Sequence, residues 1–162
     1  MSRPGREPED PCEVDACRES ALRLLDAADR PSGALRDRLI DKGYDDETVA
    51  AVVDRLIEVG LVDDESYAQS AVRYCVGRLM GYRGAVMELA RKGVDRPLAE
   101  RVCDEARMSG VFEDAAWELG RRSAAKTQGM DPKVRKRRFW SSGGRKGHDA
   151  ETLRAVAHEL FD

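Results

Sequence analysis

The chain has 162 residues, of which 41% are hydrophobic and 36% are charged, with a formal net charge of −3. This is enough apolar material for one domain or for three small units, and so much charge favours helices with one buried stripe each. No run of 18 or more apolar residues is present in the sequence, which excludes a membrane-spanning helix of the usual kind.

The segment Met1–Pro11 is rich in proline, glutamate and arginine and has no apolar stretch. We therefore expect no secretory signal, a disordered segment over residues 1–12, and a cytoplasmic protein.

The first helix is expected over about Glu13–Ala28, with a stripe of Cys17, Ala21, Leu24, Leu25 and Ala28. Arg30-Pro31 should end it, because the residue before a proline avoids helical geometry. Ser32 can then cap a short second helix with an apolar side of Leu35, Leu39 and Ile40, which stops at Gly43.

A third helix should begin after Asp45 and end at Gly60, because its apolar residues follow helical spacing. These residues are Val49, Val52, Val53, Leu56 and Ile57. Residues 13–60 are thus predicted to be a first three-helix repeat.

The same layout is expected over residues 61–110. Asp63 should cap a helix lined by Tyr67, Ala71, Tyr74, Cys75 and Leu79. Gly81–Gly84 is interpreted as the connection to a helix that carries Val86 and Leu89 and ends at Gly93. Asp95 should cap the next helix, whose stripe is Ala99, Val102, Cys103 and Ala106.

The third repeat is expected over residues 111–162 and begins with Val111-Phe112-Glu113-Asp114. Asp131-Pro132 should start a helix over about Lys133–Trp140. The poor helix formers Ser141-Ser142-Gly143-Gly144 are expected to interrupt it, and a last helix should follow over Ala150–Phe161.

A short phrase marks all three predicted repeats. It reads Asp41-Lys42-Gly43-Tyr44-Asp45, Arg91-Lys92-Gly93-Val94-Asp95 and Arg145-Lys146-Gly147-His148-Asp149, with the glycines 50 and 54 residues apart. The apolar residues that follow each glycine also correspond: Val52, Val102 and Val156, then Leu56, Ala106 and Leu160. We interpret the Lys-Gly pair as structural, and the period predicts an array whose function is binding.

Catalysis and metal binding find no support in the sequence. The four cysteines and two histidines lack zinc-site spacing, and no nucleophile–base motif or phosphate-binding glycine loop is present. We expect inert cysteines, ordinary surface or packing roles for His148 and His158, no cofactor, and a protein that is not an enzyme.

Charge is distributed unevenly along the chain. Residues 1–66 carry 9 basic and 18 acidic side chains, a net charge of −9. Residues 120–148 carry 10 basic side chains and one acidic side chain, a net charge of +9. Such asymmetry concerns partners, not fold.

Two groups of residues are candidates for binding a partner or DNA. The first is the basic stretch of the third repeat, interpreted either as a surface for phosphates or acidic protein or as a solvated helix face: Arg121, Arg122, Lys126, Lys133, Arg135, Lys136, Arg137 and Arg138, beside Phe139 and Trp140. The second group, which could equally be a packed turn, comprises Arg73, Arg78, Tyr82 and Arg83.

The chain resembles the RecX regulatory proteins of bacteria. The resemblance covers about residues 18–162 and rests on Leu56–Ala68, on the 35–44 segment, and on Gly81-Tyr82-Arg83-Gly84 followed by Glu88–Val94. It implies an all-α fold, an elongated array of three tandem three-helix repeats. In that family an unbroken helix would be expected where this chain has Ser-Ser-Gly-Gly.

The resemblance also implies a function. RecX proteins bind the filament of the RecA recombinase on single-stranded DNA and inhibit its ATPase, strand-exchange and coprotease activities. The expected partner is therefore the RecA filament, bound by a monomer, in homologous recombination, DNA repair and the SOS response. The alternative is a helical module that binds single- or double-stranded DNA directly.

Overall fold

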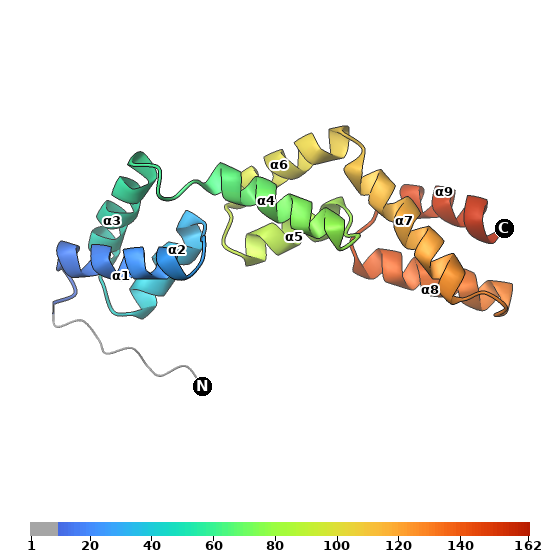
Figure 1. Ribbon diagram of the computed structural model, residues 1–162, viewed down its shortest axis with the longest axis horizontal. Helices are drawn as coiled ribbons and strands as arrows, with labels where there is room; N and C mark the ends of the chain where they lie inside the picture. Colours follow the sequence, from blue (N-terminus) through green and yellow to red (C-terminus); the bar gives the residue numbers. More distant parts are fainter. Residues whose placement is uncertain (1–9) are drawn as a thin grey trace. The chain divides into compact units, whose positions relative to one another are not determined.

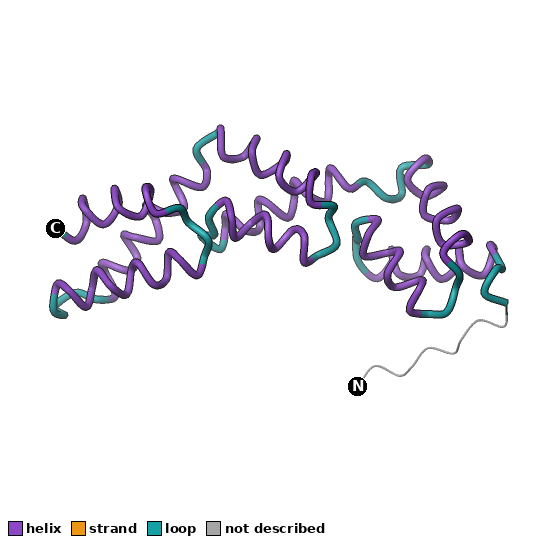
Figure 2. The backbone as a smooth tube through the Cα atoms, turned by 180° about the vertical axis from the view of Figure 1, so that it is seen from behind, coloured by secondary structure: helices purple, strands orange, loops and turns teal. Residues whose placement is uncertain are grey.

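The computed structural model describes residues 10–162, and these fold entirely into helices without a strand (Figures 1 and 2). In chain order the described helices are α1 Val14–Ala27, α2 Ser32–Asp41, α3 Asp46–Glu58, α4 Asp64–Gly77, α5 Tyr82–Arg91, α6 Arg96–Met108, α7 Val111–Lys126, α8 Pro132–Arg145 and α9 Ala150–Phe161. The predicted all-α class, with three helices in each repeat, is confirmed. None of these helices is long and apolar enough to cross a membrane.

The described residues belong to two compact units. Among them, unit 1 extends to Tyr67 and includes Lys92–Asp95, and unit 2 consists of Ala68–Arg91 with Arg96–Asp162. The disorder predicted for residues 1–9 lies outside the described residues, whereas Pro11 and Cys12 form a turn. The repeat boundaries at residues 60 and 110 stay a prediction.

Local signals start or stop several of the helices as predicted. The side chains of Asp45 and Asp149 accept hydrogen bonds from the backbone N–H of Thr48 and Thr152, each at 2.8 Å. Gly43, Gly93 and Gly147 have φ values of 105°, 101° and 83°, the left-handed geometry that ends a helix at little cost for glycine.

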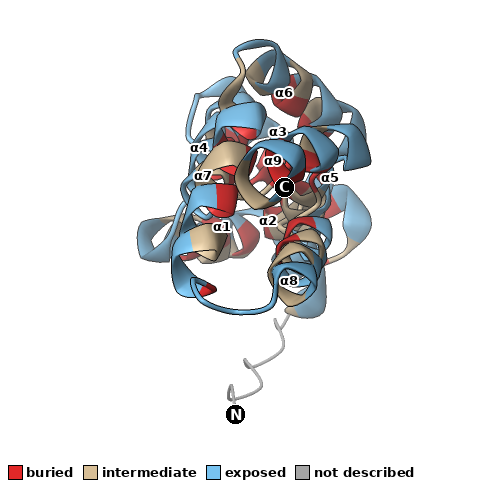
Figure 3. Cartoon of the chain, turned by 90° about the vertical axis from the view of Figure 1, so that its right-hand side faces the viewer, coloured by how far each residue is buried: buried red, intermediate tan, exposed pale blue. Residues whose placement is uncertain are grey.

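The helices bury one side and expose the other. Most of them therefore show both buried residues (red) and exposed residues (pale blue) in Figure 3. The core of unit 1 is formed by Leu35, Leu39, Val53 and Leu56 with their neighbours. In the third repeat Phe139 is fully buried and stacks on Phe161, with ring centroids 5.3 Å apart.

Several residues predicted to be buried are exposed. Ile40 and Ile57 are each 42% exposed, Tyr74 is 53% exposed, and Ala28 is also exposed. The helices α2, α3 and α4 need only the central part of each predicted stripe for packing, so the residues at its edges face solvent.

Tyr82–Gly84 was predicted to be a connection and instead forms the first turn of α5.

The predicted interruption at Ser141–Gly144 is wrong, because α8 continues to Arg145. Gly143 is buried, and a Cβ atom placed there would meet Leu153 of α9, with its Cδ1 atom at 3.0 Å. The glycine thus lets α9 approach α8, and tertiary packing outweighs the poor intrinsic propensity of this segment.

The inert role predicted for the cysteines agrees with their surroundings. Cys17, Cys75 and Cys103 are fully buried, and burial raises the pKa of Cys103 to about 12. Cys12 is exposed, but its thiol donates to the Asp45 carboxylate at 2.8 Å, and this hydrogen bond raises its pKa. The raised pKa values keep the thiols of Cys12 and Cys103 protonated at neutral pH.

In unit 1, the turn at Lys92–Asp95 packs on the start of α2. A Cβ atom at Gly93 would lie 2.7 Å from the Ala34 nitrogen, so only glycine permits this approach. Ser32 was predicted to cap α2, but Pro31 occupies that position. Ser32 is buried instead and donates to Asp64 through both its backbone N–H at 2.6 Å and its hydroxyl at 2.5 Å.

In unit 2, the turn at the end of α8 packs on the start of α5 in the corresponding way. A Cβ atom at Gly147 would collide with the backbone nitrogen of Gly84. The Gly81 N–H donates to the Lys146 carbonyl at 2.8 Å. Gly93 and Gly147 thus each end their own helix and contact the second helix of the preceding repeat.

Candidate partner-binding surface

Five basic side chains line one groove of unit 2, which has a volume of about 400 Å³. They come from the end of α4, from α7, from α8 and from the turn before α9: Arg78, Arg122, Lys126, Arg138 and Lys146. We call this the basic groove. Its lining contains no acidic side chain.

Contacts between two turns bring Arg78 and Lys146 together. The Lys146 ammonium donates to the Arg78 carbonyl at 2.8 Å, and His148 Nε2 lies 2.8 Å from the Leu79 carbonyl. Leu79 has φ 61°, the one non-glycine residue of the described chain in the left-handed region. These bonds hold the α4–α5 turn against the α8–α9 turn.

His148 is buried, with 4% of its surface exposed, so it is a packing residue and not a surface one. Burial lowers its pKa, which keeps the imidazole neutral at pH 7. We assign the Nε2–H tautomer, which donates to the Leu79 carbonyl.

The cations of the basic groove differ in how far they are already paired. Arg122 donates to Glu118 at 3.0 Å, and the hydrogen bonds from Arg122 and Arg121 lower the pKa of that carboxyl. Lys126 and Arg138 are exposed and make no side-chain hydrogen bond or ion pair with the described residues. They are therefore the charges most available to an anionic partner.

Other members of the predicted basic stretch hold the third repeat together. Arg135 donates to Thr127 Oγ1 at 3.2 Å and to the Ala124 carbonyl at 3.1 Å, and its guanidinium lies 5.4 Å from the Phe161 ring centroid. Lys136 forms a 2.6 Å ion pair with Asp162, and this contact lowers the pKa of the Asp162 carboxyl.

The remaining members lie outside the basic groove. Arg121 pairs with Glu118 at 3.2 Å. Lys133 and Arg137 are exposed on α8 and do not line the groove. Their role in binding stays a prediction.

The second predicted group is divided by the structure. Arg78 joins the basic groove, whereas Tyr82 packs edge-on against Phe112, and the Arg107 guanidinium lies 4.2 Å from the Tyr82 ring centroid. A hydrogen bond to Asp104 raises the pKa of Tyr82. Arg83 is exposed at the start of α5, and Arg73 lines a different groove.

Sequence reasoning missed Lys146 as a site residue, because it was assigned to the structural Lys-Gly phrase. The available signal was the charge count over residues 120–148, which includes it. The groove has the chemistry to hold phosphate or carboxylate groups, since five cations converge on one concave surface. The described residues contain no group of three or more His, Cys, Asp or Glu side chains arranged to hold a metal ion.

Known proteins resemble this chain in both sequence and fold. The family model described as RecX, first three-helix domain, matches residues 17–56. Regulatory protein RecX of Thermobifida fusca is 37% identical over 147 residues, which cover 88% of this chain and 78% of that protein. Regulatory protein RecX of Streptomyces lividans is 32% identical over 158 residues, which cover 96% of this chain and 82% of that protein.

Some matches are shorter. The match to regulatory protein RecX of Mycobacterium sp. strain JLS is 43% identical but spans 58% of this chain and 52% of that protein. Among solved structures, RecX from Lactobacillus salivarius superposes with a TM-score of 0.80 at 20% identity, over 91% of this chain and 96% of that chain. At this identity the match supports the fold, while the two long sequence matches establish the family: the chain belongs to the RecX family of regulatory proteins.

Proposed function

We propose that this RecX protein binds the filament that the RecA recombinase forms on single-stranded DNA and inhibits its ATPase, strand-exchange and coprotease activities. The observation that carries the proposal is the basic groove, in which Arg78, Arg122, Lys126, Arg138 and Lys146 converge without an acidic neighbour in the lining. A filament of protein and DNA offers carboxylates and phosphates along its whole length, so a one-signed surface has many partners there.

The proposed mechanism is restraint of the filament. ATP turnover and strand exchange require neighbouring recombinase subunits to move relative to each other. A helical protein that contacts more than one subunit favours one filament geometry and opposes those motions. The basic groove supplies one of these contacts.

The test is a titration of the DNA-stimulated ATPase of RecA with the full chain. We expect inhibition by the wild type and about tenfold weaker inhibition by Arg122→Gln/Lys126→Gln/Arg138→Gln, because an exposed charge contact contributes about 0.2–1 kcal/mol and three are removed. The matched control, Arg18→Gln/Arg55→Gln/Arg96→Gln, removes the same charge from arginines paired within their own helices and should inhibit normally. No inhibition by the wild type at saturation would rule out the proposal.

The second candidate function is direct binding of DNA, which the same groove favours because phosphates suit arginine and lysine. If about five phosphates are neutralised, the slope of log affinity against log salt should be roughly −3.5 to −4.5. Mobility shifts with single- and double-stranded DNA, with and without recombinase, separate the two functions. Tight binding to bare DNA together with no effect on the recombinase would favour this alternative.

A further inference from the structure

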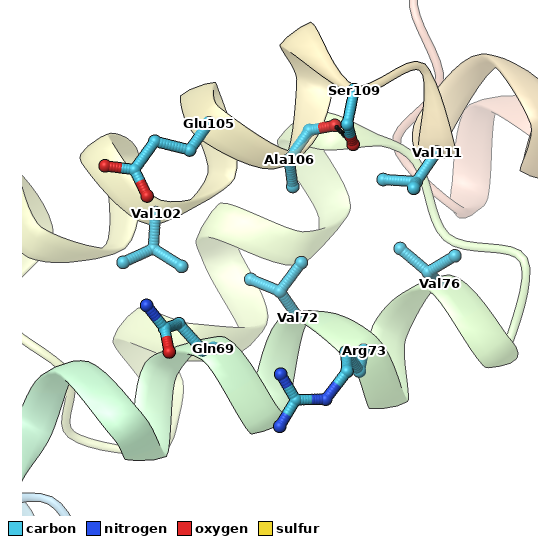
Figure 4. Close-up of a pocket in the computed structure, with 9 residues that line it drawn as sticks. All are labelled: Gln69, Val72, Arg73, Val76, Val102, Glu105, Ala106, Ser109 and Val111. Atoms are coloured by element: carbon cyan, nitrogen blue, oxygen red, sulfur yellow. Dashed lines mark hydrogen bonds between the residues drawn. The ribbon is translucent and has the colours of Figure 1, made fainter.

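The middle repeat contains a second groove, which is separate from the basic groove and shares no lining residue with it. In the first repeat α1 packs along α3, and in the third repeat α7 packs along α9. Among the described residues, α4 and α6 have no comparably close packing, and a groove of about 390 Å³ lies between them (Figure 4).

A missing side chain explains this groove. Ala106 corresponds to Leu56 of α3 and Leu160 of α9 in the repeat pattern. Leu56 is buried in its core, and Leu160 packs against the third-repeat core, so both repeats fill this position with their own leucine. Alanine lacks three of the four side-chain carbons of leucine, and the middle repeat leaves that space open.

The walls of the groove suit an aliphatic group. Figure 4 shows Val72 and Val76 of α4 facing Val102 and Ala106 of α6 and Val111 at the start of α7. Val72 and Val102 are buried, while the other three are partly exposed and define the opening. An apolar side chain that entered from a partner would therefore remove both its own surface and these side chains from water.

The rim of the groove adds a charge preference. Glu105 on the α6 side is already paired with Arg101 at 3.2 Å. Arg73 on the α4 side is exposed and donates to the neutral hydroxyl of Ser70 at 2.9 Å. Within the described chain the guanidinium therefore has no carboxylate partner, and a carboxylate from a binding partner would complement it.

We propose that the α4–α6 groove binds a leucine, isoleucine or methionine side chain presented by a segment of the recombinase, with a neighbouring carboxylate of that segment on Arg73. The partner side chain occupies the space that Leu56 and Leu160 fill in the other two repeats. This proposal rests on the proposed function, since it assigns the groove to the same filament partner.

The test replaces Ala106 with leucine, so that a side chain of this protein itself occupies the groove. We expect Ala106→Leu to weaken binding to recombinase filaments, assembled on single-stranded DNA with a non-hydrolysable ATP analogue, by about tenfold or more. Ala155→Leu places the same side chain on an exposed position of α9 and should bind as the wild type does. Thermal unfolding of Ala106→Leu checks the fold, and its midpoint should be equal to or above that of the wild type.

A second variant tests the charge without changing the core. We expect Arg73→Glu to weaken filament binding by about tenfold and Arg73→Lys to retain most of it, since lysine keeps the charge. Normal filament binding by both Ala106→Leu and Arg73→Glu would overturn the groove proposal, while inhibition by the wild type would still support the proposed function. If Ala106→Leu instead abolished self-association in sedimentation and left filament binding intact, the groove would hold a second copy and the proposal would also be wrong.

Discussion

The same backbone contact occurs in both units with different polar partners. In unit 1, Gly93 approaches the backbone at Ala34, and in unit 2, Gly147 approaches the backbone at Gly84. Around the first contact the polar link is Ser32 with Asp64, whereas hydrogen bonds from Lys146 and His148 to the α4–α5 turn surround the second.

This difference separates two requirements. The close approach of two backbones demands glycine in the repeated phrase, because no other residue fits both the φ value and the space. The polar bonds beside it can be made by different side chains in different repeats. The residue at the apolar position after the glycine varies likewise, being Tyr44, Val94 or His148, and it is buried each time.

The largest expected effect comes from Gly147→Ala. The new side chain would carry the cost of a positive φ, about 1–2 kcal/mol, and would also press on the backbone of Gly84. We expect a loss of about 3 kcal/mol in unfolding free energy, measured by chemical denaturation. Gly93→Ala tests the corresponding contact in unit 1 and should have a similar effect.

Gly110→Ala is the matched control for Gly147→Ala. Gly110 has the same φ of 83°, but a Cβ atom there would meet nothing within 4 Å. It should cost about 1 kcal/mol from backbone strain alone. If both variants lost the same amount of unfolding free energy, the contact with Gly84 would contribute nothing, and the proposed need for glycine at that contact would be wrong.

An intermediate effect is expected for Ser32→Ala in unit 1. The change removes the 2.5 Å hydrogen bond from the hydroxyl to Asp64, and a buried bond to a charged group contributes about 1.5–3 kcal/mol. Because the backbone N–H of residue 32 still donates to Asp64, we expect about 1–2 kcal/mol of destabilisation in urea unfolding. As a control, Ser141→Ala changes an exposed serine and should leave the free energy of unfolding unchanged. If Ser32→Ala also left it unchanged, the Ser32–Asp64 pair would have no stabilising role.

The smallest effect concerns pH and His148 in unit 2. Burial lowers the pKa of His148 below its ordinary 6.5, so the unfolded chain binds this proton more readily than the folded chain. The contribution of His148 to stability is therefore complete above pH 6.5 and is lost as the pH falls below that value toward the lowered pKa of the folded chain. Melting temperatures between pH 7.5 and pH 5.5 should decline less steeply for His148→Val than for the wild type.

Two results bear on this pH prediction. His158→Gln changes the exposed histidine that contacts Asp162, and it should keep the decline caused by His148. Identical pH profiles for His148→Val and the wild type would mean that the buried imidazole is not the group that couples protonation to stability in unit 2.

Much of the fold could be predicted from the sequence because the signals for it are local. Asp45 and Asp149 hydrogen-bond within the next three residues, and Gly43, Gly93 and Gly147 determine their own backbone geometry. The continuation of α8 through Gly143 could not be predicted in this way. It depends on Leu153, which reaches Gly143 only after α9 has packed on α8.

The candidate site was predicted less completely, because a charge run does not show which side chains are already engaged. Arg135 and Lys136 stand in the middle of the basic stretch, yet they bind Thr127 and Asp162 of the same chain. Lys146 joins Arg78 only because two turns meet. The α4–α6 groove had a visible sequence signal, since Ala106 corresponds to two leucines, but its meaning required the structure.

The contact between the repeated glycine and the preceding repeat has a consequence for how such a chain can lengthen. One repeat brings the glycine turn between its second and third helices and, at the start of its second helix, the small residue that the next repeat's turn requires, as Ala34 and Gly84 illustrate. A gene duplication that inserted a whole repeat would therefore create a compatible junction on both sides at once. Growth by whole repeats needs no new complementary mutations, whereas insertion of half a repeat would leave a glycine without its counterpart.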